Sequence, residues 1–130
     1  MDLPFSLLGV FLASLLGLFL GYLWYSVLFA KSWEKLSGVT KKQMETGIPK
    51  RVISSYLLSI VMAVFLGAFI GPDMSPTFGL FAGLAAGFGW VAMAFGNNYL
   101  FEHRPFKLWL INAGYNTVLL GLMGLVIGYF

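Results

Sequence analysis

The chain has 130 residues, of which 59% are hydrophobic, 18% are aromatic and only 10% are charged. A soluble domain carries roughly 25% charged residues, so this composition excludes an ordinary soluble domain and indicates one all-α membrane domain. The chain contains no cysteine, which excludes disulfides, thiol catalysis and thiolate metal sites. The net charge of +3 is explained by basic loops at a membrane surface, and nucleic acid is not expected as a partner.

The first apolar segment is expected to cross the bilayer over residues 4–29, since about 20 apolar residues cover the hydrocarbon core. Small residues recur every four positions along it and form a stripe that permits close helix packing. These residues are Gly9, Ala13, Gly17 and Gly21. The segment ends in Trp24 and Tyr25, whose amphipathic rings favour the headgroup boundary.

The long connection over residues 30–51 is basic and is expected to lie in the headgroup plane as a short amphipathic segment. Two short helices are predicted within it. The first covers Lys31–Ser37. A capping box between Thr40 and Gln43 opens the second helix, and a glycine followed by Pro49 is expected to end it.

The second and third spans are expected over residues 52–71 and 77–100, as antiparallel neighbours joined by the Pro72–Pro76 turn. The third span is predicted to be the central helix of a four-helix bundle, because small residues line two of its faces. One face holds Gly79, Gly83 and Gly87, and the other holds Ala85, Gly89, Ala92 and Gly96. Asn98 is assigned to the first face and is expected to point into a helix contact.

The fourth span is expected over residues 108–130 and also has two faces that are unsuited to lipid. Asn112 and Asn116 lie one turn apart on one face, opposite a heptad-like stripe of small residues. One face can pack within the chain and leave the other for a second copy, which predicts a homo-oligomer. The glycines expected to serve helix packing in the four spans are Gly17, Gly21, Gly67, Gly71, Gly79, Gly83, Gly87, Gly114, Gly121, Gly124 and Gly128.

All eight Lys and Arg residues lie in the connections over residues 30–51 and 101–107. The positive-inside rule therefore predicts that both connections are cytoplasmic and both termini are outside, in a bacterial cytoplasmic (inner) membrane. Two interpretations stay open for the charged turn: its groups reach water and lipid phosphates, or Glu102 pairs with Arg104 or Lys107. The residues expected at the cytoplasmic interface are Lys31, Trp33, Glu102, His103, Arg104 and Pro105.

Polar side chains of the spans gather toward their cytoplasmic ends, and the outer halves are almost entirely apolar. The candidate vestibule residues are Trp24, Tyr25, Tyr56, Asn97, Asn98, Asn112, Tyr115 and Asn116. Two interpretations stay open: interhelical hydrogen bonds that fix the helix register, or a cytoplasm-facing vestibule that holds a small polar ligand or ion. No catalytic motif, metal-ligand spacing or cofactor motif is found in the sequence.

Several short motifs together resemble a known family. Gly21-x-x-Trp24-Tyr25-Ser26, followed by Lys31-x-Trp33, is one of them. Further along come Glu102-x-Arg104-Pro105 and Asn112-x-Gly114-Tyr115. With this order of motifs the chain resembles an uncharacterised family of small bacterial membrane proteins, domain of unknown function 1761. The resemblance implies four transmembrane helices and no established activity.

Three functional hypotheses follow from these features. The first is a structural or interaction module that forms a homo-oligomer or serves as an accessory subunit of a membrane complex. The second is a carrier or channel for a small polar solute or ion, which the one-sided polar cluster favours. The third is a membrane-embedded enzyme that uses Glu102 and His103 on lipid-like substrates, although no enzyme signature supports it.

Overall fold

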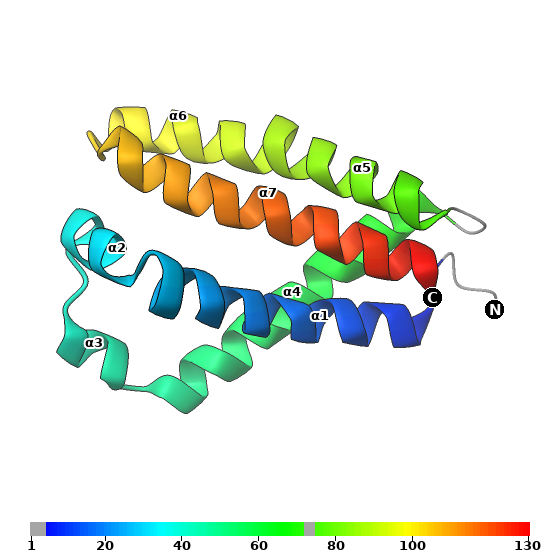
Figure 1. Ribbon diagram of the computed structural model, residues 1–130, viewed down its shortest axis with the longest axis horizontal. Coiled ribbons are helices and arrows are strands. Elements are labelled where there is room, and N and C mark those ends of the chain that lie inside the picture. The colour runs from blue at the N-terminus through cyan, green and yellow to red at the C-terminus, as the bar shows by residue number, and fades with distance from the viewer. Residues whose placement is uncertain (1–4, 72–74) are drawn as a thin grey trace.

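The computed structural model describes residues 5–71 and 75–130, and within those ranges the chain is helical with no β-strand. The elements are α1 (Leu7–Tyr22), η1 (Leu23–Leu28), α2 (Ala30–Ser37), α3 (Lys41–Glu45), α4 (Ile48–Ile70), α5 (Pro76–Ala86), η2 (Gly87–Ala92), α6 (Met93–Phe101) and α7 (Phe106–Tyr129). The two η elements are π-helical and continue their neighbours without a break, so that four long helices result (Figure 1). All four are long and apolar enough to cross a membrane, which confirms the predicted fold class.

The central helix of the bundle is α7, which packs against α1, α4, α5 and η2. Of its apolar stretch 44% is buried, against 22% for the third span, Pro76–Phe101. The prediction that the third span is central is therefore wrong. The physical reason is that both special faces of α7 find partners within the chain. Its small residues lie against α5 and η2, and the amide of Asn112 bonds to η1 and α6.

Helices α5 and α7 lie side by side along most of their length and touch backbone to backbone (Figure 1). A Cβ atom built on Gly79 would fall on the carbonyl group of Gly124, and one built on Gly124 would fall on that of Gly79. One turn further along, Gly83 lies against the carbonyl group of Leu120. In lipid, where apolar burial does not draw helices together, this close contact supplies van der Waals attraction over a long interface.

The helix that carries the second span begins at Ile48, before the start predicted at residue 52. Gly47, with φ +68°, is the N-cap of α4, and Pro49 lies in its first turn. Proline is tolerated there because the first backbone N–H groups of a helix have no partner within it. Lys50 and Arg51 therefore belong to α4, and the basic connection ends at Gly47 instead of residue 51.

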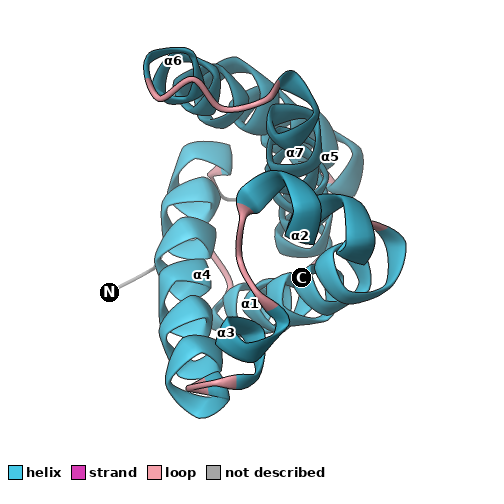
Figure 2. Cartoon of the chain, turned by 90° about the vertical axis from the view of Figure 1, so that its left-hand side faces the viewer, coloured by secondary structure: helices cyan, strands magenta, loops and turns pink. Residues whose placement is uncertain are grey.

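The two predicted short helices of the basic connection are confirmed as α2 and α3. Gly38 ends α2 with φ +78°, and the reciprocal capping box of Thr40 and Gln43 opens α3. The guanidinium group of Arg51 donates to the carbonyl oxygens at the end of α3, those of Gln43, Met44 and Thr46. This contact ties α3 to the start of α4 (Figure 2).

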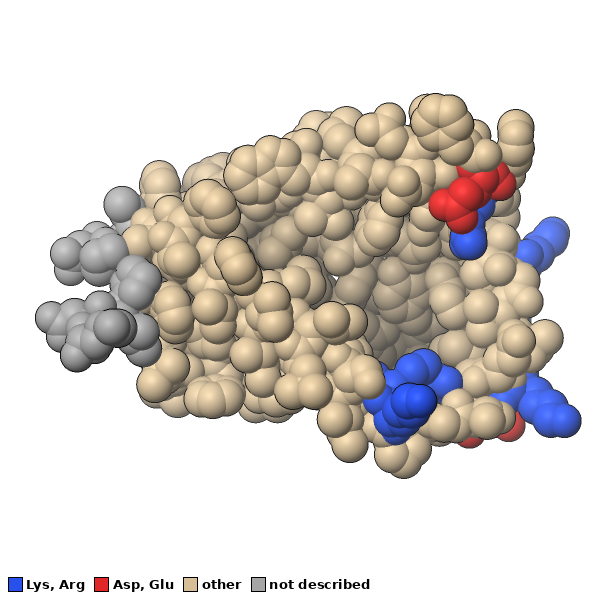
Figure 3. All heavy atoms as spheres, turned by 180° about the vertical axis from the view of Figure 1, so that it is seen from behind, with Lys and Arg blue, Asp and Glu red and all other residues tan. Residues whose placement is uncertain are grey.

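Helices α4 and α5 make few contacts with each other, although they follow one another in the chain. Residues 72–74 of the predicted Pro72–Pro76 turn lie outside the described residues. Gly71 ends α4 with φ +80°, and a Cβ atom built on it would meet no group within 4 Å among the described residues. α4 packs mainly against α1 instead. An apolar cavity of about 500 Å³ lies between α4 and α5–η2. Figure 3 views the molecule from this side and shows a hollow toward the end where the charged side chains gather.

Candidate functional site

Two consecutive aromatic residues of η1 reach α7 together. The indole Nε1 of Trp24 donates to the carbonyl oxygen of Ile111 at 2.9 Å. The phenol of Tyr25 donates to Oδ1 of Asn112 at 2.7 Å. In an α-helix neighbouring side chains diverge by about 100°, whereas the wider π-helical turn rotates less per residue and lets both rings face one helix.

Asn112 joins three of the four spans through its side-chain amide. While its Oδ1 accepts from Tyr25, its Nδ2 lies 2.7 Å from the hydroxyl oxygen of Tyr99 on α6. The ring of Tyr25 also packs edge-on against Tyr115 and against Trp33 of α2, at centroid distances of 5.1 and 5.4 Å. We call Trp24, Tyr25, Tyr99, Asn112 and Tyr115 the phenol–amide cluster.

The cluster extends to the charged turn between α6 and α7. The guanidinium group of Arg104 lies over the ring of Tyr99, 5.4 Å from its centroid. Its Nε donates to Glu102 Oε1 at 3.1 Å, one of the two pairings expected from the sequence, and both side chains are about half exposed. Aromatic and charged groups thus follow one another from the interior of the bundle to its surface.

Glycines near the cluster make room for aromatic side chains and do not serve backbone contact there. The hydroxyl of Tyr115 donates to the carbonyl oxygen of Gly17 at 2.9 Å. A Cβ atom on Gly21 would lie 3.2 Å from that hydroxyl oxygen. A Cβ atom on Gly114 would lie 3.3 Å from Cζ2 of Trp24. The glycines near the cluster therefore leave space for aromatic rings, whereas those between α5 and α7 allow the two helix backbones to touch.

The π-helix η2 shifts the register of the third span. Gly79, Gly83 and Gly87 face α7, and α-helical periodicity would continue that face to Asn98. The extra residue of the π turn places Tyr99 there instead, bonded to Asn112, while Asn98 is exposed. The prediction that Asn98 points into a helix contact is therefore wrong.

The same shift divides the second small-residue face of the third span. Ala85 and Gly89 are exposed, and Gly89 has open space beside it. Ala92 is buried and its carbonyl oxygen accepts from Trp109 Nε1 at 2.8 Å. Gly96 also faces that indole ring. On this face, Ala85 in α5 and Gly89 within η2 are therefore left exposed, while Ala92 and Gly96 are covered by Trp109.

The structure brings together four of the eight candidate vestibule residues, namely Trp24, Tyr25, Asn112 and Tyr115. The amide of Asn116 donates to the carbonyl oxygen of Asn112 in its own helix, at 2.9 Å. Asn97 and Asn98 are exposed, and Tyr56 is half-buried outside the cluster. Sequence reasoning missed Tyr99 and Trp109 as members of this region. A phenol and an indole near the ends of spans could have indicated that both residues form hydrogen bonds there. The register shift that turns Tyr99 toward α7 could not be predicted from the sequence.

Among the residues expected at the interface, Lys31 is exposed and Trp33 contacts the cluster through Tyr25. His103 adopts a left-handed conformation with φ +57° at the end of α6. The backbone N–H groups of His103 and Arg104 donate to the carbonyl oxygens of Leu100 and Tyr99. This closes the helix in the manner of a Schellman motif, and Pro105 then precedes α7. His103 is thus part of a helix stop.

Chemically, the arrangement is suited to holding helices together. Over residues 5–71 and 75–130 every buried side-chain nitrogen or oxygen has a hydrogen-bond partner. In the same ranges no three His, Asp or Glu side chains gather closely enough to hold a metal ion. The cluster therefore connects three spans by phenol, amide and indole groups whose hydrogen bonds are made to one another and to helix carbonyls.

Together, the fold and the cluster define a multi-pass α-helical membrane protein whose spans are joined at one end by phenol and amide side chains. A family model described as a protein of unknown function (DUF1761) matches residues 8–128, and the chain belongs to this family. This confirms the family that the sequence motifs indicated. No curated protein and no solved structure matches the chain.

Proposed function

We propose that the protein is an oligomerising interaction module of the membrane, or an accessory subunit of a membrane complex. We propose further that its contact surface lies on the exposed side of the third span. This surface, which we call the outer stripe, consists of Ala85, Gly89, Asn97 and Asn98. It replaces the face of α7 from which an oligomer was first predicted, because α7 is occupied on both faces within the chain.

The observation that carries this proposal is the pair of exposed amides, Asn97 and Asn98, one turn before the end of a membrane span. An amide that faces lipid lacks hydrogen-bond partners, and satisfying it is favourable by roughly 0.5–2 kcal/mol in membrane proteins. Exposed Ala85 and Gly89 on the same side would let a second helix approach closely. A second copy or another subunit provides both the close surface and the hydrogen-bond partners.

Copy number in a lipid nanodisc tests the proposal directly. We expect a defined oligomer for the natural sequence, and dissociation to monomers for Gly89→Leu, because the bulky side chain holds the second helix away. A Cβ atom built on Gly89 meets no other group in the chain, so we expect this variant to keep the monomer fold. Ala68→Leu, at an exposed small residue of α4, is the matched control and is expected to keep the oligomer.

Two other outcomes of this experiment would decide between the forms of the proposal. A natural protein that stays monomeric in nanodiscs, and that leaves its own membrane under mild detergent without other subunits, would refute the proposal. Release together with other subunits, lost in Gly89→Leu, would support the accessory-subunit form of it.

A second candidate function is transport of a small polar solute or ion through a vestibule at the end of the bundle that carries the basic connections. The hollow seen in Figure 3 favours it, together with Asn116, whose amide uses one donor on its own helix. The prediction is solute-dependent stabilisation that is lost in Asn116→Leu and in Asn112→Leu. If both variants are stabilised by solutes to the same extent as the natural protein, the vestibule is not a binding site.

We propose that the membrane is a bacterial cytoplasmic membrane, with both termini outside and the basic connections cytoplasmic. Support comes from the clustering of α2, α3 and the α6–α7 turn at one end of the bundle (Figure 1), the end toward which the Lys and Arg side chains lie in Figure 3. Because the chain has no cysteine, a single Ser37→Cys substitution gives a unique label site. A membrane-impermeant thiol reagent is expected to label it in inverted vesicles and to leave it unlabelled in intact cells.

A further inference from the structure

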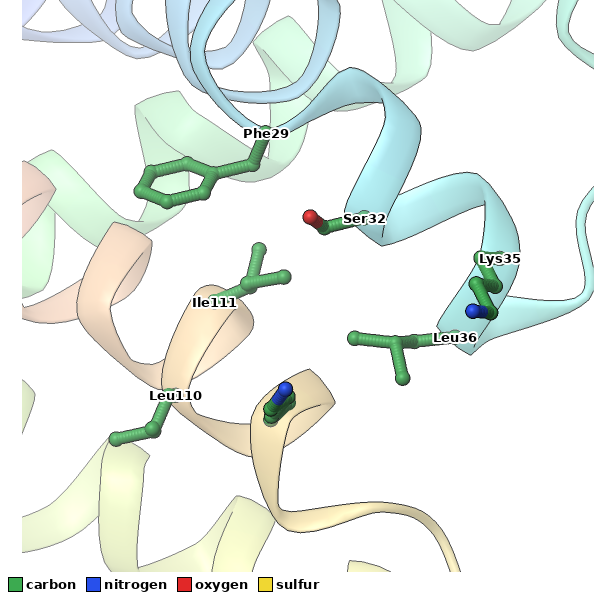
Figure 4. Close-up of a pocket in the computed structure, with 7 residues that line it drawn as sticks. Phe29, Ser32, Lys35, Leu36, Leu110 and Ile111 are labelled. Carbon is green, nitrogen blue, oxygen red and sulfur yellow. The ribbon is translucent and has the colours of Figure 1, made fainter.

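A cavity of about 390 Å³ lies between the interfacial helix α2 and the first turns of α7, apart from the phenol–amide cluster (Figure 4). Its volume falls in the range of roughly 300–1,000 Å³ that is typical of small-molecule sites. Seven residues line it, and they are Phe29, Ser32, Lys35, Leu36, Lys107, Leu110 and Ile111.

The cavity combines an apolar wall with positive charge. Phe29, Leu36, Leu110 and Ile111 form the wall, while Lys35 and Lys107 bring two ammonium groups from two different helices. Figure 4 shows Ser32, Lys35 and Leu36 projecting from the same helix, α2. No acidic residue lines the cavity, and the ion pair found among the described residues, Glu102 with Arg104, leaves both lysines unpaired.

The position of the cavity is fixed by contacts beneath it. The hydrogen bond from Trp24 to the carbonyl oxygen of Ile111 holds η1 on α7. The packing of Trp33 on Tyr25 and of Phe29 on Trp24 then holds α2 beside the start of α7. The two lysines are therefore carried on elements that are held together from within, at the boundary where a membrane span begins.

We propose that this cavity binds the phosphate of an anionic phospholipid, with Lys35 and Lys107 on the phosphate and the apolar wall against the first methylene groups of an acyl chain. The charge pattern favours an anion, since Lys35 and Lys107 both line the cavity and neither forms an ion pair with a described residue. The apolar wall and the location at the end of a span favour a lipid over a free anion. We call this the α2–α7 lipid site.

Native mass spectrometry of the full chain in mild detergent, titrated with phosphatidylglycerol or phosphatidylcholine, tests the site. We expect tighter binding of phosphatidylglycerol. Replacement of both lysines by glutamine, K35Q with K107Q, is expected to weaken that binding about 30-fold. Each lysine near an anionic headgroup strengthens binding by a factor of about five to six, and the two factors multiply. The double arginine variant, K35R with K107R, keeps the charge and is expected to bind like the natural protein.

The matched control is the double variant K41Q with K42Q, which removes the same charge from exposed positions of α3. It is expected to change the affinity by less than about threefold. Equal losses in the two glutamine pairs would refute the site, because they would mean a general attraction of the basic end for anionic lipid. Inorganic phosphate that displaces the lipid at millimolar concentration would also refute it, in favour of a free-anion site. All variants replace exposed side chains, and their thermal unfolding checks that the fold is kept.

Discussion

Replacing Gly83 by alanine tests the close contact between α5 and α7 with a single methyl group. The new Cβ atom would lie 2.9 Å from the Cα atom of Gly121 and would overlap the carbonyl group of Leu120. These are backbone atoms, which cannot rotate aside as a side chain does. The two helices therefore have to separate, and the neighbouring contact of Gly79 with Gly124 opens with them.

The change in the free energy of unfolding expected for Gly83→Ala is the balance of two opposing effects. Adding a methyl group to a packed site costs about 1–3 kcal/mol, and the rigid neighbours place this site at the upper end. Alanine is favoured over glycine inside a helix by about 0.5–1 kcal/mol, which offsets part of the loss. We expect Gly83→Ala to lower the free energy of unfolding by about 2 kcal/mol.

Gly89→Ala is the matched control in the same span. Within one chain a Cβ atom on Gly89 meets no other group, so in the monomer only the gain in helix propensity remains and the variant is expected to unfold at the same denaturant concentration as the natural protein or a higher one. Unfolding in mixed micelles, followed by the fluorescence of the four tryptophans, measures both variants. If Gly83→Ala and Gly89→Ala unfold at the same denaturant concentration, the backbone contact between α5 and α7 does not exist as described.

Two further predictions concern single interactions. A double-mutant cycle of Tyr25→Phe and Asn112→Leu is expected to give a coupling energy of about 0.5–2 kcal/mol, measured by unfolding in mixed micelles; additive effects would exclude the hydrogen bond. Thr40→Ala removes one half of the capping box, costs about 1 kcal/mol locally and is expected to speed hydrogen exchange at the amide of Gln43; unchanged exchange there would argue against the cap.

The sequence predicts best the features that depend on local chemistry. Hydrophobic length identified the four spans, and the capping box and Gly38 located the two short helices of the basic connection. The start of α4 was missed because Pro49 was interpreted as a stop, although a proline in the first turn is compatible with a helix start. The sequence around Pro49 is compatible with the end of one helix and with the start of the next. Only the backbone conformation of the neighbouring residues distinguishes the two.

The candidate site was predicted in part because its geometry depends on helix register. Trp24, Tyr25, Asn112 and Tyr115 lie in the cluster, but Asn98 was placed where Tyr99 lies. The assignment assumed an unbroken α-helix from Gly79 onward, and one added residue in a π turn rotates everything beyond it. Likewise, no periodicity in the third span could reveal that α7 is central, since that depends on contacts between residues far apart in the chain.

The central place of α7 also sets the order in which the bundle can assemble during synthesis. The first three spans leave the ribosome before α7, and among their mutual contacts only those between α1 and α4 are extensive. The third span therefore waits in the bilayer with Gly79, Gly83 and Gly87 open to lipid until the fourth span arrives. We therefore expect the bundle to be completed only after the fourth span is inserted, with a third span that the first two do not yet hold.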